Sequence, residues 1–177
     1  MYPDTLIQLI MAHLVYISIG SNIGNLLNNC CQAMEALRSD PDIRMIAHSP
    51  FYRTAPVDFL EQDWFLNAAL KLRTAVQPMQ LLDRMRAVQR NLGRKTDTVR
   101  FGPRIIDLDI NFYGDLVLDT AELILPHPRM HKRRFVLQPI CDIDPTIVHP
   151  LLGVSAQDLL NQLVIDDQEI EKCSYGC

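Results

Sequence analysis

Strand-like and helix-like segments follow one another along this chain in an order that few folds accommodate. The strand-like segments are rich in β-branched and aromatic residues, whereas the helix-like segments carry apolar residues at intervals of three and four. They occur as strand, helix, strand, strand, helix, strand over residues 14–19, 25–37, 43–52, 65–72, 78–92 and 105–113. This βαββαβ order predicts an α+β, ferredoxin-like sandwich, an antiparallel sheet with helices packed on it. Short helices near Phe135 and Ala156 are expected as C-terminal additions.

Length and composition are those of an ordinary soluble protein. At 177 residues the chain is expected to form a single domain over residues 1–177, with residues 1–12 as an extension. The formal net charge of −4 argues against a general nucleic-acid-binding protein, which needs a basic surface. No apolar run reaches the length of a membrane span, and the N-terminus does not resemble a signal peptide. We therefore expect a cytoplasmic monomer with no nucleic-acid or membrane partner.

The number and spacing of the cysteines indicate no structural role for them. They are Cys30, Cys31, Cys141, Cys173 and Cys177, an odd number with two adjacent and no Cys-x-x-Cys pair. Neither a disulfide framework nor a zinc site is expected, and a reducing cytosol fits this pattern. Cys173 and Cys177 are close enough in sequence to oxidise, but a frayed terminus is the favoured interpretation.

Two carboxylates stand out in the last predicted strand. Asp107 and Asp109 are two residues apart, so their side chains should share one face of the strand. The segment is otherwise apolar, and buried carboxylates need a compensating charge. A divalent metal supplies this charge, and Mg²⁺ is usually held by one or two carboxylates together with substrate phosphates. The structural alternative is that both aspartates meet water or pair with arginines.

Six short motifs then follow in a fixed order. They are GSNIGN at 20–25, FYRTAPV at 51–57, FLNAAL at 65–70, LGR at 92–94, FGPRIIDLDI at 101–110 and PHPRMHKRRFVL at 126–137. Together they closely resemble the 6-hydroxymethyl-7,8-dihydropterin pyrophosphokinases of folate biosynthesis, from about Leu14 to Leu152. The resemblance implies transfer of the β,γ-pyrophosphoryl group of ATP to the pterin hydroxymethyl oxygen, with release of AMP. It also implies two Mg²⁺ ions held by Asp107 and Asp109.

The same resemblance assigns the other site residues. Arg94 and Arg104 would act in the transfer step with the two aspartates. The pterin-binding residues would be Thr54, Pro56, Val57, Phe65, Asn67, Phe101 and Phe135. The ATP-binding residues would be Gln89, Arg100, Arg104, Ile110, His127 and Arg133. A pterin needs a flat apolar slot with a few polar groups, and Asn67 is the telling member because it is polar within an apolar strand.

Some of these residues also have an interpretation that involves no ligand. Phe65 and Phe135 are also plausible core residues, and the basic segment 94–103 is also plausible as a solvated loop. Beside the aspartates we favour a loop that closes over ATP, because guanidinium groups bind phosphate oxygens in bidentate fashion.

Some positions depart from the family pattern, and two other functions stay open. The departures are Gln89, Ala55, Phe101, Thr96, Glu122 and Ile124, and they concern individual contacts, chiefly to ATP. One alternative function is another Mg²⁺-dependent nucleotidyl or phosphoryl transferase on a ferredoxin-like core. The other is a ligand-sensing or RNA-binding module, although RNA binding would favour exposed aromatic residues and a basic surface.

Overall fold

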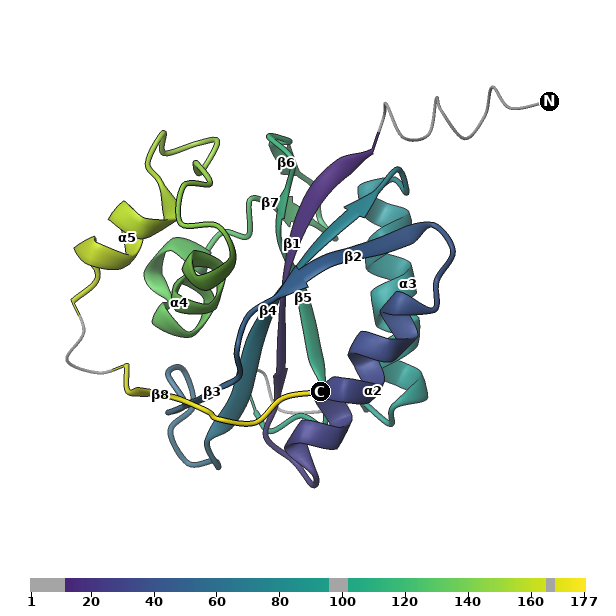
Figure 1. Cartoon of the computed structure of the whole chain (residues 1–177), viewed down its shortest axis with the longest axis vertical. Coiled ribbons are helices and arrows are strands. Elements are labelled where there is room, and N and C mark those ends of the chain that lie inside the picture. Colours follow the sequence, from purple (N-terminus) through teal and green to yellow (C-terminus); the bar gives the residue numbers. More distant parts are fainter. Residues whose placement is uncertain (1–11, 96–101, 165–167) are drawn as a thin grey trace.

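The computed structural model describes residues 12–95, 102–164 and 168–177 (Figure 1). Within these ranges, the strands of the main sheet follow the order β5-β1-β4-β3-β8, and β2 also pairs with β4. All of these pairs are antiparallel. The strands are β1 (His13–Ser21), β2 (Ile43–His48), β3 (Tyr52–Thr54), β4 (Phe65–Thr74), β5 (Asp107–Tyr113) and β8 (Ile170–Lys172). Strands β6 (Leu118–Asp119) and β7 (Ile124–Leu125) form a separate two-stranded sheet.

Helices cover both faces of the main sheet (Figure 1). Helices α2 (Leu26–Arg38) and α3 (Pro78–Asn91) lie on one face, with a core built around residues such as Ile17, Leu37 and Leu81. Helices α4 (Arg134–Ile143) and α5 (Ala156–Gln162), with the 3₁₀ turn η1 (Met130–Lys132), build a second core on the other face. The predicted α+β, ferredoxin-like fold is confirmed, and the C-terminal additions cover the second face. None of the described helices has the length and apolar character needed to cross a membrane.

Local signals set the ends of the first two helices. The Asn25 side chain accepts a hydrogen bond from the Asn28 N–H at 3.1 Å and caps α2. Pro78 begins α3. An N–H at the first position of a helix has no partner within the helix, so proline loses no hydrogen bond there. Gly93 follows the end of α3 with φ of 92°, a conformation that favours glycine. The reversal at Gly93 leads the chain from α3 to Arg94.

The strand predicted over residues 43–52 is divided into β2 and β3. Pro50 lies at the break and has no N–H for the sheet. Ser49 maintains the connection to β4, because its N–H donates to the Ala69 carbonyl and its Oγ accepts from the Ala69 N–H, both at 2.9 Å. After the break, Tyr52 pairs with Asn67, so β3 reaches the end of the sheet where the predicted pterin residues lie.

A bulge in β5 affects which residues share a face. Tyr16 and Ile17 of β1 pair with Phe112 and Ile110, so Asn111 is the extra residue. Ile110 packs in the core with α2 and α3, whereas Phe112 packs in the core with α4 and α5. Regular alternation would place both side chains on one face. The bulge therefore allows β5 to contribute to both cores.

The C-terminal tail is an ordered part of the sheet edge. Strand β8 pairs with β3, and the Cys173 N–H donates to the Phe51 carbonyl at 2.8 Å. The tail then ends in a disulfide between Cys177 and Cys31 of α2. The predictions of a frayed terminus and of no disulfide are therefore wrong. The bond joins residues 146 positions apart, and cysteine spacing carries no information on such a pairing.

Reduction of the Cys31–Cys177 bond is expected to lower the free energy of unfolding by about 2–4 kcal/mol, because the cross-link restricts the unfolded chain. Urea denaturation followed by circular dichroism, with and without a reducing agent, measures the effect. Cys31→Ser should show the lower midpoint under both conditions. Cys173→Ser is the matched control, since the Cys173 thiol is free. Its urea midpoint should still fall when the reducing agent is added. Equal midpoints for the unsubstituted chain under both conditions would contradict a stabilising role.

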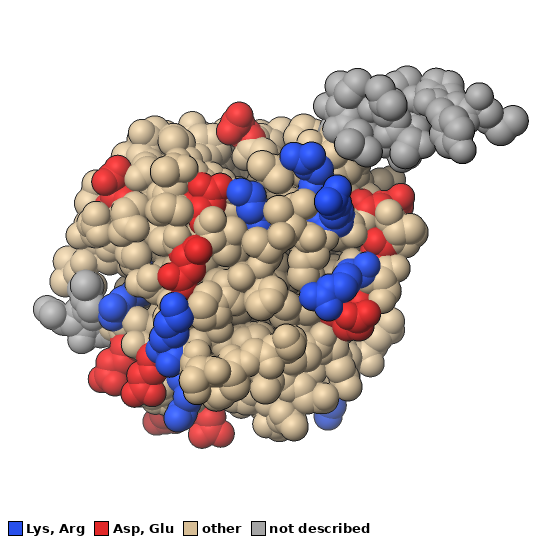
Figure 2. Space-filling view, in the orientation of Figure 1, with Lys and Arg blue, Asp and Glu red and all other residues tan. Residues whose placement is uncertain are grey.

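Charged side chains of both signs are interspersed on the face shown in Figure 2. Ion pairs such as Lys71–Asp144 and Arg84–Asp40, both at 2.7 Å, join elements distant in sequence. The first pair links β4 to the residue that follows α4, and Tyr16 donates a hydrogen bond to the same carboxylate at 2.5 Å. The two contacts of Asp144 fasten the second helical layer to the sheet.

Candidate active site

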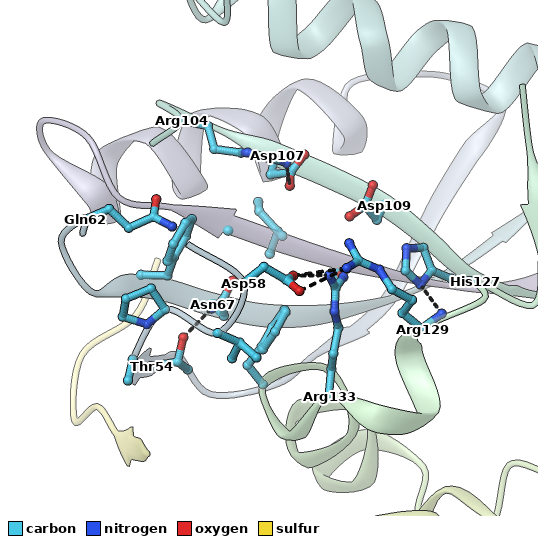
Figure 3. Close-up of a pocket in the computed structure, with 18 residues that line it drawn as sticks. Thr54, Asp58, Gln62, Asn67, Arg104, Asp107, Asp109, His127, Arg129 and Arg133 are labelled. Carbon is cyan, nitrogen blue, oxygen red and sulfur yellow. Dashed lines mark hydrogen bonds and ion pairs between the residues drawn. The ribbon is translucent and has the colours of Figure 1, made fainter. Parts of the chain in front are cut away.

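The two aspartates lie at the start of β5, with both side chains directed into one cavity of about 250 Å³ (Figure 3). The cavity lies at the end of the sheet, between the loop of residues 55–63 and the segment that precedes α4. Both carboxylates are partly buried, and they share one face of the strand, as the alternation along the strand predicted.

The described residues predicted to bind a pterin gather in this cavity. Asn67 is 6% exposed, and its Nδ2 donates a hydrogen bond to Thr54 Oγ1 at 2.7 Å. The other members that line the cavity are Pro56, Val57, Phe65 and Phe135. Phe65 and Phe135 are partly exposed, so neither is confined to the core. Phe101 lies outside the described residues.

Gly20 leaves the space in which the Asn67 amide sits. A Cβ atom at Gly20 would lie 2.3 Å from Asn67 Oδ1, well inside the distance at which atoms repel. Gly20 pairs with Asn67 across β1 and β4 and with Asp107 across β1 and β5. The absence of a side chain in the middle strand thus keeps the floor of the cavity open between the amide and the carboxylate.

Two arginines hold Asp107. Arg94 Nη1 and Arg104 Nη1 donate to opposite oxygens of its carboxylate. Arg94 also donates to Gln89 Oε1, and this oxygen accepts the Leu108 N–H at 3.1 Å. Gln89 is 5% exposed, so it anchors Arg94 to β5 from inside the protein. From the sequence, pairing with arginines was an alternative for the two aspartates. Asp107 makes such pairs.

Asp109 is in a different environment. Among the described residues it has no hydrogen-bond or ion-pair partner. Burial, and then the negative charge of Asp107, raise the pKa of Asp109, whereas Arg104, Arg94 and Arg133 act in the opposite direction. A buried carboxylate without a partner gains most when a cation binds to it.

The donor set at these aspartates fits magnesium rather than a metal held by protein alone. The described residues contain no group of three or more His, Cys, Asp or Glu side chains that could hold a metal ion. Asp107 and Asp109 therefore provide two carboxylates, and water or phosphate oxygens would have to complete the coordination. This division of ligands is typical of Mg²⁺.

A second cavity, of about 570 Å³, shares Asp109 and His127 with the first. It lies between α3 and the β6–β7 region, and the predicted ATP residues Gln89 and Ile110 line it together with Arg94. Glu122 and Ile124, which depart from the family pattern, also line it. The remaining described residues predicted for ATP, Arg104 and Arg133, line the first cavity instead. Arg100, like the departure Thr96, lies outside the described residues.

His127 is held in a defined protonation state where the two cavities meet. Burial, followed by the positive charges of Arg133 and Arg129, lowers the pKa of His127 to about 4, so the ring is neutral at neutral pH. Its Nδ1 accepts the Arg129 N–H at 3.2 Å. The proton of the neutral ring is therefore on Nε2, which can donate to a ligand oxygen.

Asn22 joins three segments around the first cavity, a role not predicted from the sequence. Its Oδ1 accepts the Arg104 N–H at 2.7 Å, and its Nδ2 donates to Gln62 Oε1 at 3.0 Å and to the Asp63 carbonyl at 3.2 Å. The turn after β1 is thus linked both to the loop of residues 55–63 and to the residues ahead of β5. The sequence does show a polar residue directly after an apolar strand. Its hydrogen-bond partners are distant in sequence, so the linking role could not be predicted from this position.

Fold and site together define a ferredoxin-like α+β protein with two adjoining cavities, each lined by both arginines and carboxylates. The chain belongs to the 7,8-dihydro-6-hydroxymethylpterin-pyrophosphokinase (HPPK) family, whose model matches residues 16–145.

Several known proteins resemble the chain. A 2-amino-4-hydroxy-6-hydroxymethyldihydropteridine pyrophosphokinase of Methylorubrum extorquens is 40% identical over 157 residues, which are 89% of this chain and 96% of that protein. A folic acid synthesis protein of Pneumocystis carinii is 40% identical over 153 residues, which are 86% of this chain and 20% of that protein. The chain spans 20–26% of the length of the first curated relatives that it matches.

A solved structure shows the same fold. The crystal structure of a Plasmodium falciparum HPPK-DHPS triple mutant aligns with a TM-score of 0.71 at 15% sequence identity. The alignment covers 85% of this chain and 44% of that one.

Proposed function

We propose that the protein transfers the β,γ-pyrophosphoryl group of ATP to the hydroxymethyl oxygen of 6-hydroxymethyl-7,8-dihydropterin. The products would be AMP and the pterin diphosphate, in folate biosynthesis. Family membership supports this reaction. The observation that carries it is the position of Asp109, a partly buried carboxylate with no partner among the described residues, on the wall shared by two cavities. One cavity suits a pterin and the other suits a nucleotide.

The first cavity would bind the pterin. Phe65 and Phe135 offer aromatic faces to a flat ring, and Pro56 and Val57 offer apolar contacts. Asn67 donates one N–H to Thr54, so its Oδ1 and second N–H are available to the amide-like edge of the ring. By resemblance, Phe101 would also contact the pterin.

The second cavity would bind ATP. Ile110 would lie beside the adenine, and His127 Nε2–H would donate to a phosphate or ribose oxygen. Arg133 would contact the phosphates from the first cavity, near Asp109. By resemblance, Arg100 would contact the nucleotide as well. Gln89 is buried and hydrogen-bonded to β5 and Arg94, which supports a role in holding the wall of this cavity.

Magnesium and arginine would share the work of charge stabilisation. Two Mg²⁺ ions are proposed at Asp107 and Asp109, and the metal would neutralise charge on the phosphate oxygens when bound. Arg104 lines the first cavity and Arg94 lines the second, so the two guanidinium groups approach Asp107 from both sides. This placement supports a role for both arginines in stabilising charge during transfer.

The matched region supports a single catalytic domain. The relative from Methylorubrum extorquens consists almost entirely of it, with 96% of its length aligned. We therefore propose that residues 1–177 contain one domain that carries the whole site.

A product assay tests the proposed reaction. AMP release should require both Mg²⁺ and 6-hydroxymethyl-7,8-dihydropterin, and a 6-methyl analogue without the acceptor oxygen should give none. Release of pyrophosphate without pterin would instead indicate another nucleotidyl or phosphoryl transferase. Failure to bind ATP in the presence of Mg²⁺ would indicate a sensing or RNA-binding module.

A further inference from the structure

A third carboxylate enters the first cavity from the opposite wall. Asp58 belongs to the loop of residues 55–63, and its carboxylate faces two arginines that precede α4 (Figure 3). Arg129 Nη1 donates to both carboxylate oxygens, at 3.1 and 3.2 Å. Arg133 Nη2 donates to Oδ2 at 2.8 Å. One carboxylate therefore holds two guanidinium groups at the cavity wall.

The two arginines need an anion between them. The Arg133 side chain is 12% exposed, and burial followed by the positive charge of Arg129 lowers the pKa of Arg133. The carboxylates of Asp58 and, more weakly, Asp109 act in the opposite direction. Two close cations repel each other, and the negative charge of Asp58 offsets this repulsion. Asp58 therefore keeps the two guanidinium groups close together at the cavity.

We propose that Asp58 is a positioning residue that occupies, before substrate binds, the place that a phosphate group takes between Arg129 and Arg133. This rests on the proposed function, in which Arg133 contacts the polyphosphate of ATP. It adds Arg129 as a further phosphate-binding residue. A phosphate group offers more oxygens and more negative charge than a carboxylate, so it replaces Asp58 on the two guanidinium groups.

The exchange links the two substrates. When phosphate replaces Asp58, the loop of residues 55–63 loses its ion pairs to the segment before α4. Pro56 and Val57 belong to the same loop and line the pterin part of the cavity. Occupation of the arginines by phosphate thus changes the wall against which the pterin packs.

Binding of inorganic tripolyphosphate, without nucleotide or metal, tests the exchange. Asp58→Asn should bind tripolyphosphate about fivefold more tightly than the unsubstituted chain, because the competing anion is gone while solvent screens partly exposed pairs of this kind. The double variant Asp58→Asn/Arg129→Gln should lose this gain. Isothermal titration calorimetry measures the affinities, and circular dichroism verifies folding. Asp58→Ser serves as a second variant and should show the same gain.

Glu61→Gln is the matched control. Glu61 is an exposed carboxylate of the same loop and has no hydrogen-bond or ion-pair partner among the described residues. It should bind tripolyphosphate as the unsubstituted chain does. Unchanged or weaker binding by the Asp58 variants would overturn the proposal, and so would an equal gain in Glu61→Gln. Since the probe is neither nucleotide nor pterin, a failure of pterin-dependent AMP release would overturn the proposed function separately.

Discussion

Replacement of Asp109 by asparagine is expected to lower pterin-dependent AMP release by about a thousandfold, even at saturating Mg²⁺. The amide that replaces the carboxylate is neutral, so it cannot hold a cation against the phosphate oxygens. Asp107 does not compensate, because Arg94 and Arg104 already pair with it. Asp109 has no such partner among the described residues, and its negative charge is available to a metal.

The rate of AMP release, measured by chromatography across a Mg²⁺ titration, gives the size of this effect. Asp115→Asn is a suitable control, because Asp115 is an exposed carboxylate just after the end of β5. It should leave turnover unchanged. The Asp109→Asn protein should also be at least as stable as the unsubstituted chain, since burial of an unpaired charge is unfavourable. Near-normal AMP release by Asp109→Asn at saturating Mg²⁺ would show that the metal assignment is wrong.

Asn67→Ala is expected to weaken pterin binding by about a hundredfold and to leave nucleotide binding intact. A polar ring edge that loses its buried partner stays unpaired, and an unpaired buried polar group costs about 1–3 kcal/mol, which at its upper end is about a hundredfold in affinity. Asn67 lines only the first of the two cavities, whereas the nucleotide is assigned mainly to the second. Calorimetric titrations with the pterin and with α,β-methylene-ATP separate the two effects.

A second substitution tests the same amide without removing it. Gly20→Ala would place a Cβ atom 2.3 Å from Asn67 Oδ1, so the amide must move, and pterin affinity should fall in the same direction. Gly176→Ala is the control, because its Cβ would meet nothing within 4 Å. Equal losses of pterin and nucleotide affinity in Asn67→Ala would contradict its assignment to the pterin.

The parts of the structure that follow from local pattern could be predicted from the sequence. Alternation along β5 places Asp107 and Asp109 on one face, and the helical spacing with Asn25, Pro78 and Gly93 defines α2 and α3 closely. The order of these elements then restricts the sheet to few arrangements. In each case the physical cause acts over a few residues, so the sequence contains it.

Contacts between distant segments were not predictable in this way. Asp58 meets Arg129 and Arg133 from 71 and 75 positions away, and Cys31 meets Cys177 from 146 positions away. Strand β8 is three residues long and becomes a strand because the edge of β3 offers its backbone groups. Such pairings depend on where loops and tails pass over the folded core, and residue type alone leaves many partners open.

The ion pairs of Asp107 also bear on how the chain reaches its folded state. Arg94 and Arg104 come from the chain itself, so the carboxylate has its counter-charges as soon as the sheet forms. Folding and metal binding are thus separate equilibria, in contrast to small zinc domains that unfold when their metal is removed. A chelator should leave the fold in place, and magnesium adds stability only by mass action. A newly synthesised chain can complete its fold before it meets either metal or nucleotide.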